Sequence, residues 1–195
     1  CRTAEEALNS VNKIIRYESD SDLQGKWRNE LYFVADDEDV NADVNSFYRQ
    51  SDQLADSLAK NYGGVHPNKL YVGSYEQEVF ASYERSPAMQ EALSKMMQKG
   101  ALIVNYIGHG AYNSWTDEAI LTNNLISTWR NTDHFPLFIT ATCEFGRHDS
   151  PALTSGAQVL LHQKNSGAIG LLTTSRPVFS NTNFELNKAF YQSAF

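Results

Sequence analysis

A histidine between two glycines and a cysteine further along the chain are the side chains whose types and settings are best suited to chemistry. His109 stands in YIGHG, directly after the apolar run 101–107, and Cys143 closes the run FPLFITATC at 135–143. A thiol is nucleophilic as the thiolate, and an imidazole that accepts its proton makes it reactive near neutral pH. The pair suggests nucleophilic catalysis by Cys143 with His109 as general base.

Either residue taken alone also has an ordinary structural explanation. Glycines beside His109 permit a sharp turn and leave an unshielded amide, but such a turn needs no catalytic role for its histidine. A cysteine at the end of an apolar run is often a small buried residue. The catalytic interpretation gains weight only if the fold brings both side chains to one edge of the molecule.

The elements that would position this pair are expected to form a parallel sheet. Short runs that are apolar throughout alternate with helix-like segments, which is typical of a parallel sheet covered on both faces. The expected strands are 31–35, 69–74, 101–107, 135–142 and 168–174. Ligands of such sheets bind beyond the carboxyl ends of the strands, where His109 and Cys143 would both lie. The predicted fold class is α/β, a doubly wound and mostly parallel sheet.

Helices are expected between these runs. The segment 86–100 has the clearest ends, because Ser86 can cap it, Pro87 suits the first turn and Gly100 follows it. Further helices are expected at 1–18, from about Asp43 to Tyr62, within 150–167, and from about Asn183 onward. The length of 195 residues fits one α/β domain with one substantial core.

The charge balance excludes some classes of partner. The net charge is -7 and acidic residues gather between positions 20 and 43, so nucleic acid or an anionic membrane would be repelled. No apolar run approaches the roughly 18 residues of a membrane span, and we expect no transmembrane segment. Two cysteines, Cys1 and Cys143, give no disulfide framework. Because the chain begins without Met and ends on a helix-like segment, we expect it to be an excerpt of something longer.

The two apolar blocks also resemble those of a known family. ALIVNYIGHG at 101–110 and FPLFITATCEFG at 135–146 resemble the signature blocks of caspase-fold cysteine peptidases, in which one strand ends in His-Gly and a later one in the nucleophilic cysteine. Within that clan the chain is most similar to the gingipain family (C25), with Trp115 shortly after the histidine. The resemblance runs from about residue 30 to the end. It implies a three-layer caspase-like fold, with residues 1–195 forming a single catalytic domain or subdomain of a longer secreted protein.

The resemblance implies roles for individual residues. Cys143 would attack the scissile carbonyl, His109 would protonate the leaving amine, and the backbone amides of Gly110 and Cys143 would hold the oxyanion. Residues near the strand ends would line the substrate pocket: Trp115, Glu144, Thr173, Thr174, Ser175 and Arg176. The family's histidine-orienting acid aligns near Gln50 and Asp52, which are the candidates for a third residue, although a cysteine-histidine pair can work without one.

Among members of the family, the chain looks most like the surface sortases of the type IX secretion system. This likeness implies a cysteine endopeptidase or transpeptidase that cleaves the C-terminal signal domains of secreted cargo, with lipopolysaccharide as an acceptor in the transpeptidase case. It further implies other secretion-system components as partners and a place on the outer-membrane surface of a Gram-negative bacterium. The alternative is a catalytically inactive caspase-fold module that binds signal domains through the same cleft.

This chemistry requires no cofactor, but two groups of residues could bind a metal. The acidic stretch after the first strand offers carboxylates for a structural Ca²⁺, and related secreted peptidases bind calcium. Its candidate ligands are Asp36, Asp37, Asp39 and Asp43. The stretch lacks EF-hand spacing, and a solvated loop explains it about as well. A metal-dependent hydrolase would draw on His134, Cys143, Glu144 and His148, whose spacing matches no zinc motif.

Overall fold

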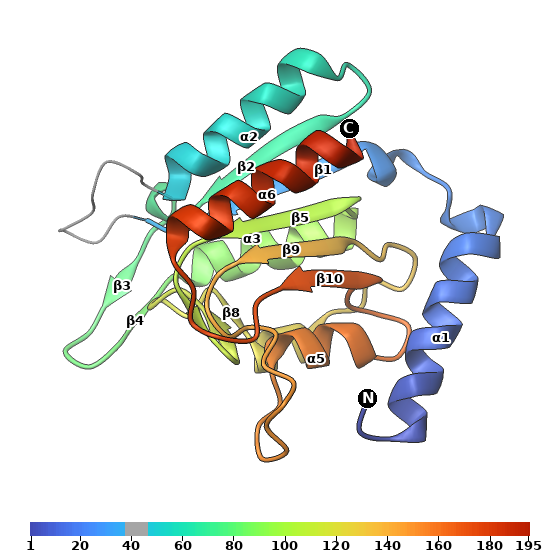
Figure 1. Ribbon diagram of the computed structural model, residues 1–195. Coiled ribbons are helices and arrows are strands. Elements are labelled where there is room, and N and C mark those ends of the chain that lie inside the picture. Colours follow the sequence, from blue (N-terminus) through green and yellow to red (C-terminus); the bar gives the residue numbers. More distant parts are fainter. Residues whose placement is uncertain (38–46) are drawn as a thin grey trace.

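The computed structural model describes residues 1–37 and 47–195, and its centre is one parallel sheet with helices on both faces (Figure 1). The five strands follow the order β10-β9-β5-β1-β2, and every neighbouring pair is parallel. These strands are β1 (Glu30–Ala35), β2 (His66–Tyr71), β5 (Ile103–Ile107), β9 (Leu137–Ala141) and β10 (Gly170–Thr173). The predicted α/β class with a mostly parallel sheet is confirmed.

Helices complete two further layers, each with its own hydrophobic core. The helices are α1 (Ala4–Ser19), α2 (Phe47–Asn61), α3 (Pro87–Lys99), α4 (Asn123–Thr128), α5 (Gly156–His162) and α6 (Ser180–Ala194). On one face, α2 and α6 bury Leu54 and Tyr191 against the sheet, while α3, α4 and α5 contribute to the core of the other face. Neighbouring strand residues serve opposite faces, since Phe33 packs in the first core and Val34 in the second.

Short elements connect the layers. They are the 3-10 turns η1 (Ser21–Leu23), η2 (Lys26–Asn29) and η3 (Val72–Ser74), the hairpin β3 (Glu78–Val79) with β4 (Glu84–Arg85), and the small sheet β6 (Gly110–Ala111), β7 (Ser114–Trp115) and β8 (Leu121–Thr122). The β6-β7-β8 sheet begins directly after His109, so it forms the continuation of β5. Within the described ranges, no helix is both long and apolar enough to cross a membrane.

Helix α1 is fastened to the rest of the molecule by a buried lysine. The Lys13 side chain is 1% exposed, and its ammonium group donates to the carbonyl oxygens of Leu160 at 3.4 Å, Ser166 at 3.0 Å and Ala168 at 2.9 Å. Burial lowers the pKa of Lys13 to about 8, because a desolvated ammonium is disfavoured. The fold therefore holds an ionisable group where three backbone carbonyls serve as its partners.

Some predicted boundaries differ from the observed ones. The second strand was expected at 69–74 but spans His66–Tyr71, and residues 72–74 form a 3-10 turn. The helix expected within 150–167 begins only after Ser155, which forms a capping box with Gln158. Ser86 precedes α3 as expected, but its hydroxyl does not cap the helix and instead donates to the Glu76 carbonyl at 2.8 Å.

Candidate active site

His109 and Cys143 follow the ends of neighbouring strands. In the paired register of β5 and β9, Ile107 lies opposite Ala141, and His109 and Cys143 each come two residues later. Paired strands are about 4.8 Å apart. The backbone N–H of Gly108 also donates to the Ala141 carbonyl at 3.4 Å, which continues the pairing past the strand end. The expected placement of both residues at one edge of one sheet is therefore observed.

The main chain of His109 is held at both of its polar atoms. Its N–H donates to Oδ2 of Asp36 at 2.8 Å, and its carbonyl accepts from the Thr116 N–H at 3.1 Å and from the Tyr106 hydroxyl. The residue is exposed, and its ring meets the Phe47 ring edge to face, with centroids 5.1 Å apart and planes at 87°. A fixed backbone thus presents an accessible imidazole.

The glycines beside His109 are needed for space. A Cβ at Gly108 would lie 2.5 Å from Cβ of Asp36, and one at Gly110 would lie 2.5 Å from Oγ1 of Thr142. The glycines with positive φ are Gly100 and Gly167, so neither neighbour of His109 is in the left-handed region. The expected sharp glycine turn is therefore replaced by close packing against the end of β1 and against the residue before Cys143.

Cys143 sits at an abrupt change of chain direction. Its thiol is half-buried, and Sγ lies 3.8 Å from the Val178 carbonyl oxygen. The next residue, Glu144, has a φ of 54°, in the left-handed region that residues other than glycine seldom adopt. The Gly146 N–H then donates to the Thr174 carbonyl at 2.8 Å. The segment after the cysteine is thereby bound to the segment after β10.

An ion pair joins the same two segments at the surface. The Arg176 guanidinium donates to both carboxylate oxygens of Asp149, and these hydrogen bonds lower the pKa of Asp149 to about 2. Within the loop after Cys143, Nη1 of Arg147 lies 3.0 Å from Oε1 of Glu144. The charged groups closest to Cys143 in sequence are thus already paired, and Arg176 and Asp149 are both solvent-exposed.

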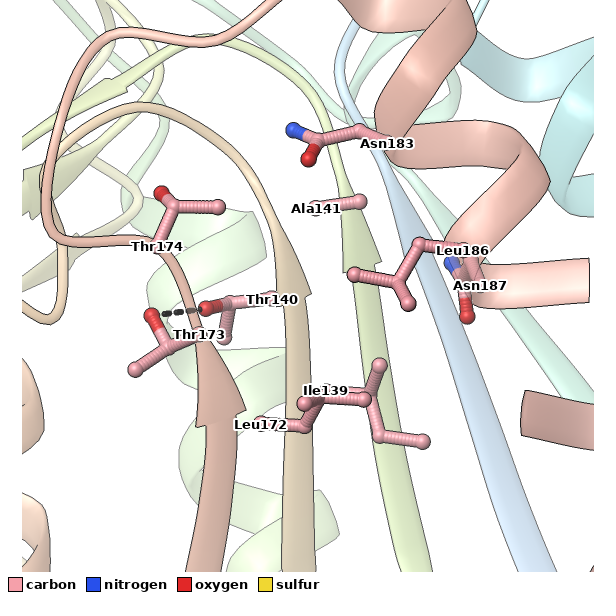
Figure 2. A pocket seen from close by; sticks show the side chains of 9 residues that line it. All are labelled: Ile139, Thr140, Ala141, Leu172, Thr173, Thr174, Asn183, Leu186 and Asn187. Atoms are coloured by element: carbon pink, nitrogen blue, oxygen red, sulfur yellow. Dashed lines mark hydrogen bonds between the residues drawn. The ribbon is translucent and has the colours of Figure 1, made fainter. Parts of the chain in front are cut away.

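The remaining residues predicted for a substrate pocket have different surroundings. Thr173 and Thr174 line a small cavity of about 30 Å³ between β9, β10 and α6, where Oγ1 of Thr140 donates to Oγ1 of Thr173 at 2.6 Å (Figure 2). Ser175 is half-buried in the loop that follows. Thr173 is the last residue of β10, the strand next to β9, and Thr174 and Ser175 follow it on the same edge as Cys143.

The prediction that Trp115 lines a substrate pocket is wrong. Its side chain is 0% exposed and stacks on Tyr106, with ring centroids 4.1 Å apart and planes at 6°. It also meets Phe138 and Phe145 at 6.1 and 5.5 Å. Trp115 belongs to the hydrophobic core on the face covered by α3 to α5. It supports the strand that carries His109 from within.

Neither candidate for the third residue reaches the His109 ring. Asp52 accepts from Lys69 Nζ at 2.7 Å and from the Tyr71 hydroxyl at 2.6 Å, on the side of α2 that faces the edge strand β2. Gln50 is buried, and its Nε2 donates to Ser180 Oγ at 3.4 Å. In the described part of the chain, neither side chain hydrogen-bonds the imidazole. The predicted orienting role is therefore not borne out by the contacts of Asp52 or Gln50.

The carboxylate that does contact His109 is Asp36, through the backbone. Asp36 and Asp37 were predicted as metal ligands, and the structure brings Glu118 to them, with one ligand oxygen from each within 4.8 Å of the others. The other two predicted ligands, Asp39 and Asp43, lie outside the described residues. Sequence reasoning missed Glu118 because it is far away in the chain and lies in a turn after the two-residue strand β7, which leaves no sequence pattern.

The alternative zinc set is not assembled in the described residues. His134 packs edge to face on Trp27, with centroids 5.4 Å apart, and Nδ1 of His148 lies 3.1 Å from the Gly146 carbonyl oxygen. The group of acids around Asp36 is the one potential metal-binding cluster found in the described ranges. A zinc hydrolase centred on Cys143 therefore has no support in the geometry.

The layered sheet and the two strand ends place the protein among α/β proteins with the caspase-like fold. The profile described as Peptidase family C25 matches residues 1–195. The chain belongs to this family of cysteine peptidases, which includes the gingipains. The family resemblance drawn from the two apolar blocks is confirmed.

Solved gingipain structures share the fold. The crystal structure of the Arg-specific cysteine proteinase gingipain R (RgpB) matches with a TM-score of 0.77 and 18% identity, over 99% of this chain and 43% of that one. The complex of Porphyromonas gingivalis RgpB pro- and mature domains matches with a TM-score of 0.78 and 16% identity, over 98% and 43%. This chain thus spans less than half the length of either matched chain. No curated protein sequence is significantly similar to it.

Proposed function

We propose that this chain carries the catalytic centre of a gingipain-type cysteine endopeptidase, with Cys143 as nucleophile and His109 as general base and acid. The observation that carries the proposal is the placement of the two residues, each two positions beyond the paired Ile107 and Ala141 of adjacent parallel strands. Membership of a cysteine peptidase family supports it. Ligands of parallel sheets bind at this edge.

The proposed reaction follows from thiol and imidazole chemistry. His109 accepts the thiol proton of Cys143, and the thiolate adds to the scissile carbonyl to form a tetrahedral intermediate. The C–N bond then breaks, the leaving amine takes the proton from His109, and a thioester remains on Cys143. Water or an amine attacks the thioester, and the thiol is restored. Backbone amides of Gly110 and Cys143 are the proposed donors to the oxyanion.

The surroundings of the pair fit a substrate that lies along the sheet edge. Glu144, Thr173, Thr174, Ser175 and Arg176 are proposed to contact the substrate. They belong to the two segments that the Gly146 and Thr174 backbone hydrogen bond ties together. Because the Arg176 guanidinium is paired with Asp149, the wall formed by this loop offers no unpaired acid to a basic substrate side chain.

The proposed substrates are the C-terminal signal domains of secreted cargo. This step rests on the resemblance of the sequence to the type IX surface sortase PorU. Under this proposal the whole protein acts at the outer-membrane surface of a Gram-negative bacterium, with other secretion-system components as partners. In that setting, an amine of lipopolysaccharide would compete with water for the thioester. A solved relative that contains both pro- and mature domains of RgpB supports protein segments as ligands of this fold.

Cysteine substitution in the complete protein tests the proposal. Cys143→Ala should abolish cleavage of a signal-domain substrate while leaving circular dichroism and the melting temperature unchanged. Cys1→Ala is the matched control, since Cys1 is the other cysteine of the chain and is exposed. It should retain activity and labelling by a thiol-directed probe. Cleavage by the Cys143→Ala protein, or no labelling of Cys143 in the mature protein, would refute the proposal.

A second measurement separates transfer from hydrolysis. Cleaved cargo is analysed by mass spectrometry with and without an added amine acceptor. Transpeptidation predicts product whose mass is raised by the acceptor less one water relative to the hydrolysed product. Hydrolysis predicts a free carboxylate at every acceptor concentration.

An inactive binding module remains the second candidate, because the His109 ring has no hydrogen-bonding side-chain partner among the described residues. That candidate predicts equal affinity for a signal domain in the wild type and in Cys143→Ala, with cleavage in neither. Binding measured by calorimetry beside the cleavage assay therefore distinguishes a module from an enzyme.

A further inference from the structure

Three carboxyl groups from two distant segments meet beside the main chain of His109. Asp36 and Asp37 follow β1, and Glu118 follows the strand β7. One ligand oxygen from each of the three lies within 4.8 Å of the other two. The residues between these segments include the whole of α2, α3 and β5, so the cluster is created by the tertiary fold.

Burial makes this arrangement costly for carboxylates alone. Asp36 is 3% exposed and Glu118 is 4% exposed. Oε2 of Glu118 is buried and has no hydrogen-bond partner among the described residues. By contrast, Asp36 accepts the N–H of His109, and Oδ2 of Asp37 accepts from Nε2 of Gln77 at 2.6 Å. A buried and unpaired carboxylate oxygen carries a desolvation penalty that some further ligand would relieve.

The described part of the chain supplies no positive side chain to this cluster. None of the eight ion pairs within the described residues includes Asp36, Asp37 or Glu118. Three carboxylates this close repel one another, and burial of Asp36 and Glu118 reduces the screening of that repulsion by water. A bound cation would remove this repulsion and satisfy the unpaired oxygen.

We propose that Asp36, Asp37 and Glu118 bind one hard divalent cation, Ca²⁺. All three offer carboxylate oxygens, which Ca²⁺ prefers and which can bind in mono- or bidentate fashion. Sulfur and imidazole ligands, which favour zinc, do not belong to the cluster. The ligand set combines two residues expected from the sequence with Glu118, and it needs neither Asp39 nor Asp43.

The proposed ion has a structural consequence for the candidate active site. Asp36 would contact the ion and also the backbone N–H of His109. Glu118 lies two residues after Thr116, whose N–H donates to the His109 carbonyl. The ion would therefore join the two segments that hold the His109 main chain from opposite sides. Its role is to fix a loop, and it takes no part in the proposed peptide cleavage.

Calcium-dependent thermal unfolding tests the proposal. The complete protein, with Cys143→Ala to prevent self-cleavage, is freed of metal with a chelator and melted at increasing CaCl₂ or MgCl₂. The melting temperature should rise with CaCl₂, because a ligand that binds only the folded state stabilises it. Calorimetry should give one site in the parent protein and a dissociation constant at least about tenfold weaker in Glu118→Gln, since affinity follows the number of charged ligands.

The change in stability caused by Glu118→Gln should differ in sign without and with the ion. Without metal, Glu118→Gln should be at least as stable as its parent, because it removes a buried negative charge. With CaCl₂, Glu118→Gln should show little of the rise in melting temperature that the parent protein shows. Asp117→Asn is the matched control, as Asp117 is the exposed neighbour outside the cluster, and it should respond to CaCl₂ like the parent.

Clear outcomes would overturn the cation site. One is a parent protein whose melting temperature does not respond to CaCl₂, and another is an equal response in Glu118→Gln. If Glu118→Gln does not fold, Asp37→Asn at the half-buried ligand takes its place, with the same expected loss of the calcium response. Because the readout is unfolding in a protein without Cys143, its failure is independent of the proposed peptidase activity.

Discussion

The backbone N–H of His109 donates to the Asp36 carboxylate across two adjacent strand ends, at 2.8 Å. Asp36 follows β1 and His109 follows β5, which pair in parallel register. The Asp36 N–H in turn donates to the Ile107 carbonyl at 3.1 Å. Together these two hydrogen bonds tie the end of β1 to the turn that presents the imidazole.

Asp36 should therefore act as a positioning residue for His109. Asp36→Leu removes the acceptor and should lower kcat about tenfold with little change in KM, since a backbone N–H left without its partner costs about 1–3 kcal/mol. Asp36→Asn keeps an acceptor oxygen and should recover most of kcat. Steady-state kinetics on a cleavable peptide provides the measurement. An Asn variant as impaired as the Leu variant would contradict a role through this hydrogen bond.

Gly110 should be intolerant of a side chain. A Cβ there would lie 2.5 Å from Oγ1 of Thr142 and 3.0 Å from the Ser114 carbonyl oxygen, so Gly110→Ala must push Thr142 and the adjacent Cys143. We expect a loss of more than about tenfold in kcat/KM, because small displacements of reacting groups are expensive. The double variant with Thr142→Ala removes the closer contact and should recover part of the activity. No recovery would show that the Ser114 contact dominates.

Trp115 should matter for stability and not for substrate affinity. It is fully buried, so Trp115→Ala should cost about 3–5 kcal/mol of unfolding free energy, as for other large aromatic truncations in cores. Trp115→Phe should cost less and leave KM unchanged. Urea unfolding and KM values measured on the same samples check both statements. A KM change in a fully folded Trp115→Phe protein would argue for substrate contact.

Lys13 should make stability depend on pH in the alkaline range. Its pKa falls from 10.5 to about 8 on folding, so between these values the unfolded chain binds more protons and stability rises with pH. The full effect is about 3 kcal/mol, at 1.36 kcal/mol per pKa unit. Below about pH 8 the fold bears the cost of an ammonium group in a buried position.

Comparison with Lys13→Met separates the contribution of the Lys13 ammonium to the pH dependence of stability from the contributions of other titrating groups. Urea unfolding of both proteins is measured between pH 7 and 10.5. The free energy of unfolding of the wild type should rise relative to that of Lys13→Met as the pH rises. A difference that stays constant over this range would mean that the Lys13 ammonium is not perturbed by burial.

The strands that carry the candidate site could be predicted because they are mostly apolar on both faces, with Asn105 and Thr140 as the buried polar exceptions. Residues 103–107 and 137–141 lie in the middle of the sheet, where continuous apolar runs are required. The predicted strand 69–74 starts three residues later than the observed edge strand β2, because His66, Pro67 and Asn68 do not form an apolar run. An edge position tolerates such residues. Helix α5 begins well inside the expected range 150–167, because Ser155 and Gln158 form the capping box at its first turn.

The surroundings of His109 and Cys143 could be predicted less well, because they depend on contacts between distant segments. Nothing in the spacing of Trp115 from His109 indicates that the indole turns inward to stack on Tyr106. The family resemblance indicates Asp52 and Gln50 by sequence position alone, whereas the partners of Asp52, Lys69 and Tyr71, come from the neighbouring strand. Glu118 joins Asp36 through the β6-β7-β8 sheet, whose short strands leave no periodic pattern.

Three hydrogen bonds hold the main chain of residue 109, with Asp36, Tyr106 and Thr116 as partners, while its ring contacts Phe47. Because these hydrogen bonds use backbone atoms of residue 109, they do not depend on the identity of its side chain. Replacement of the imidazole by alanine or asparagine should leave the architecture of the edge intact, so such variants would report on proton transfer alone. By the same logic, this position could receive other reactive side chains without redesign of its supports.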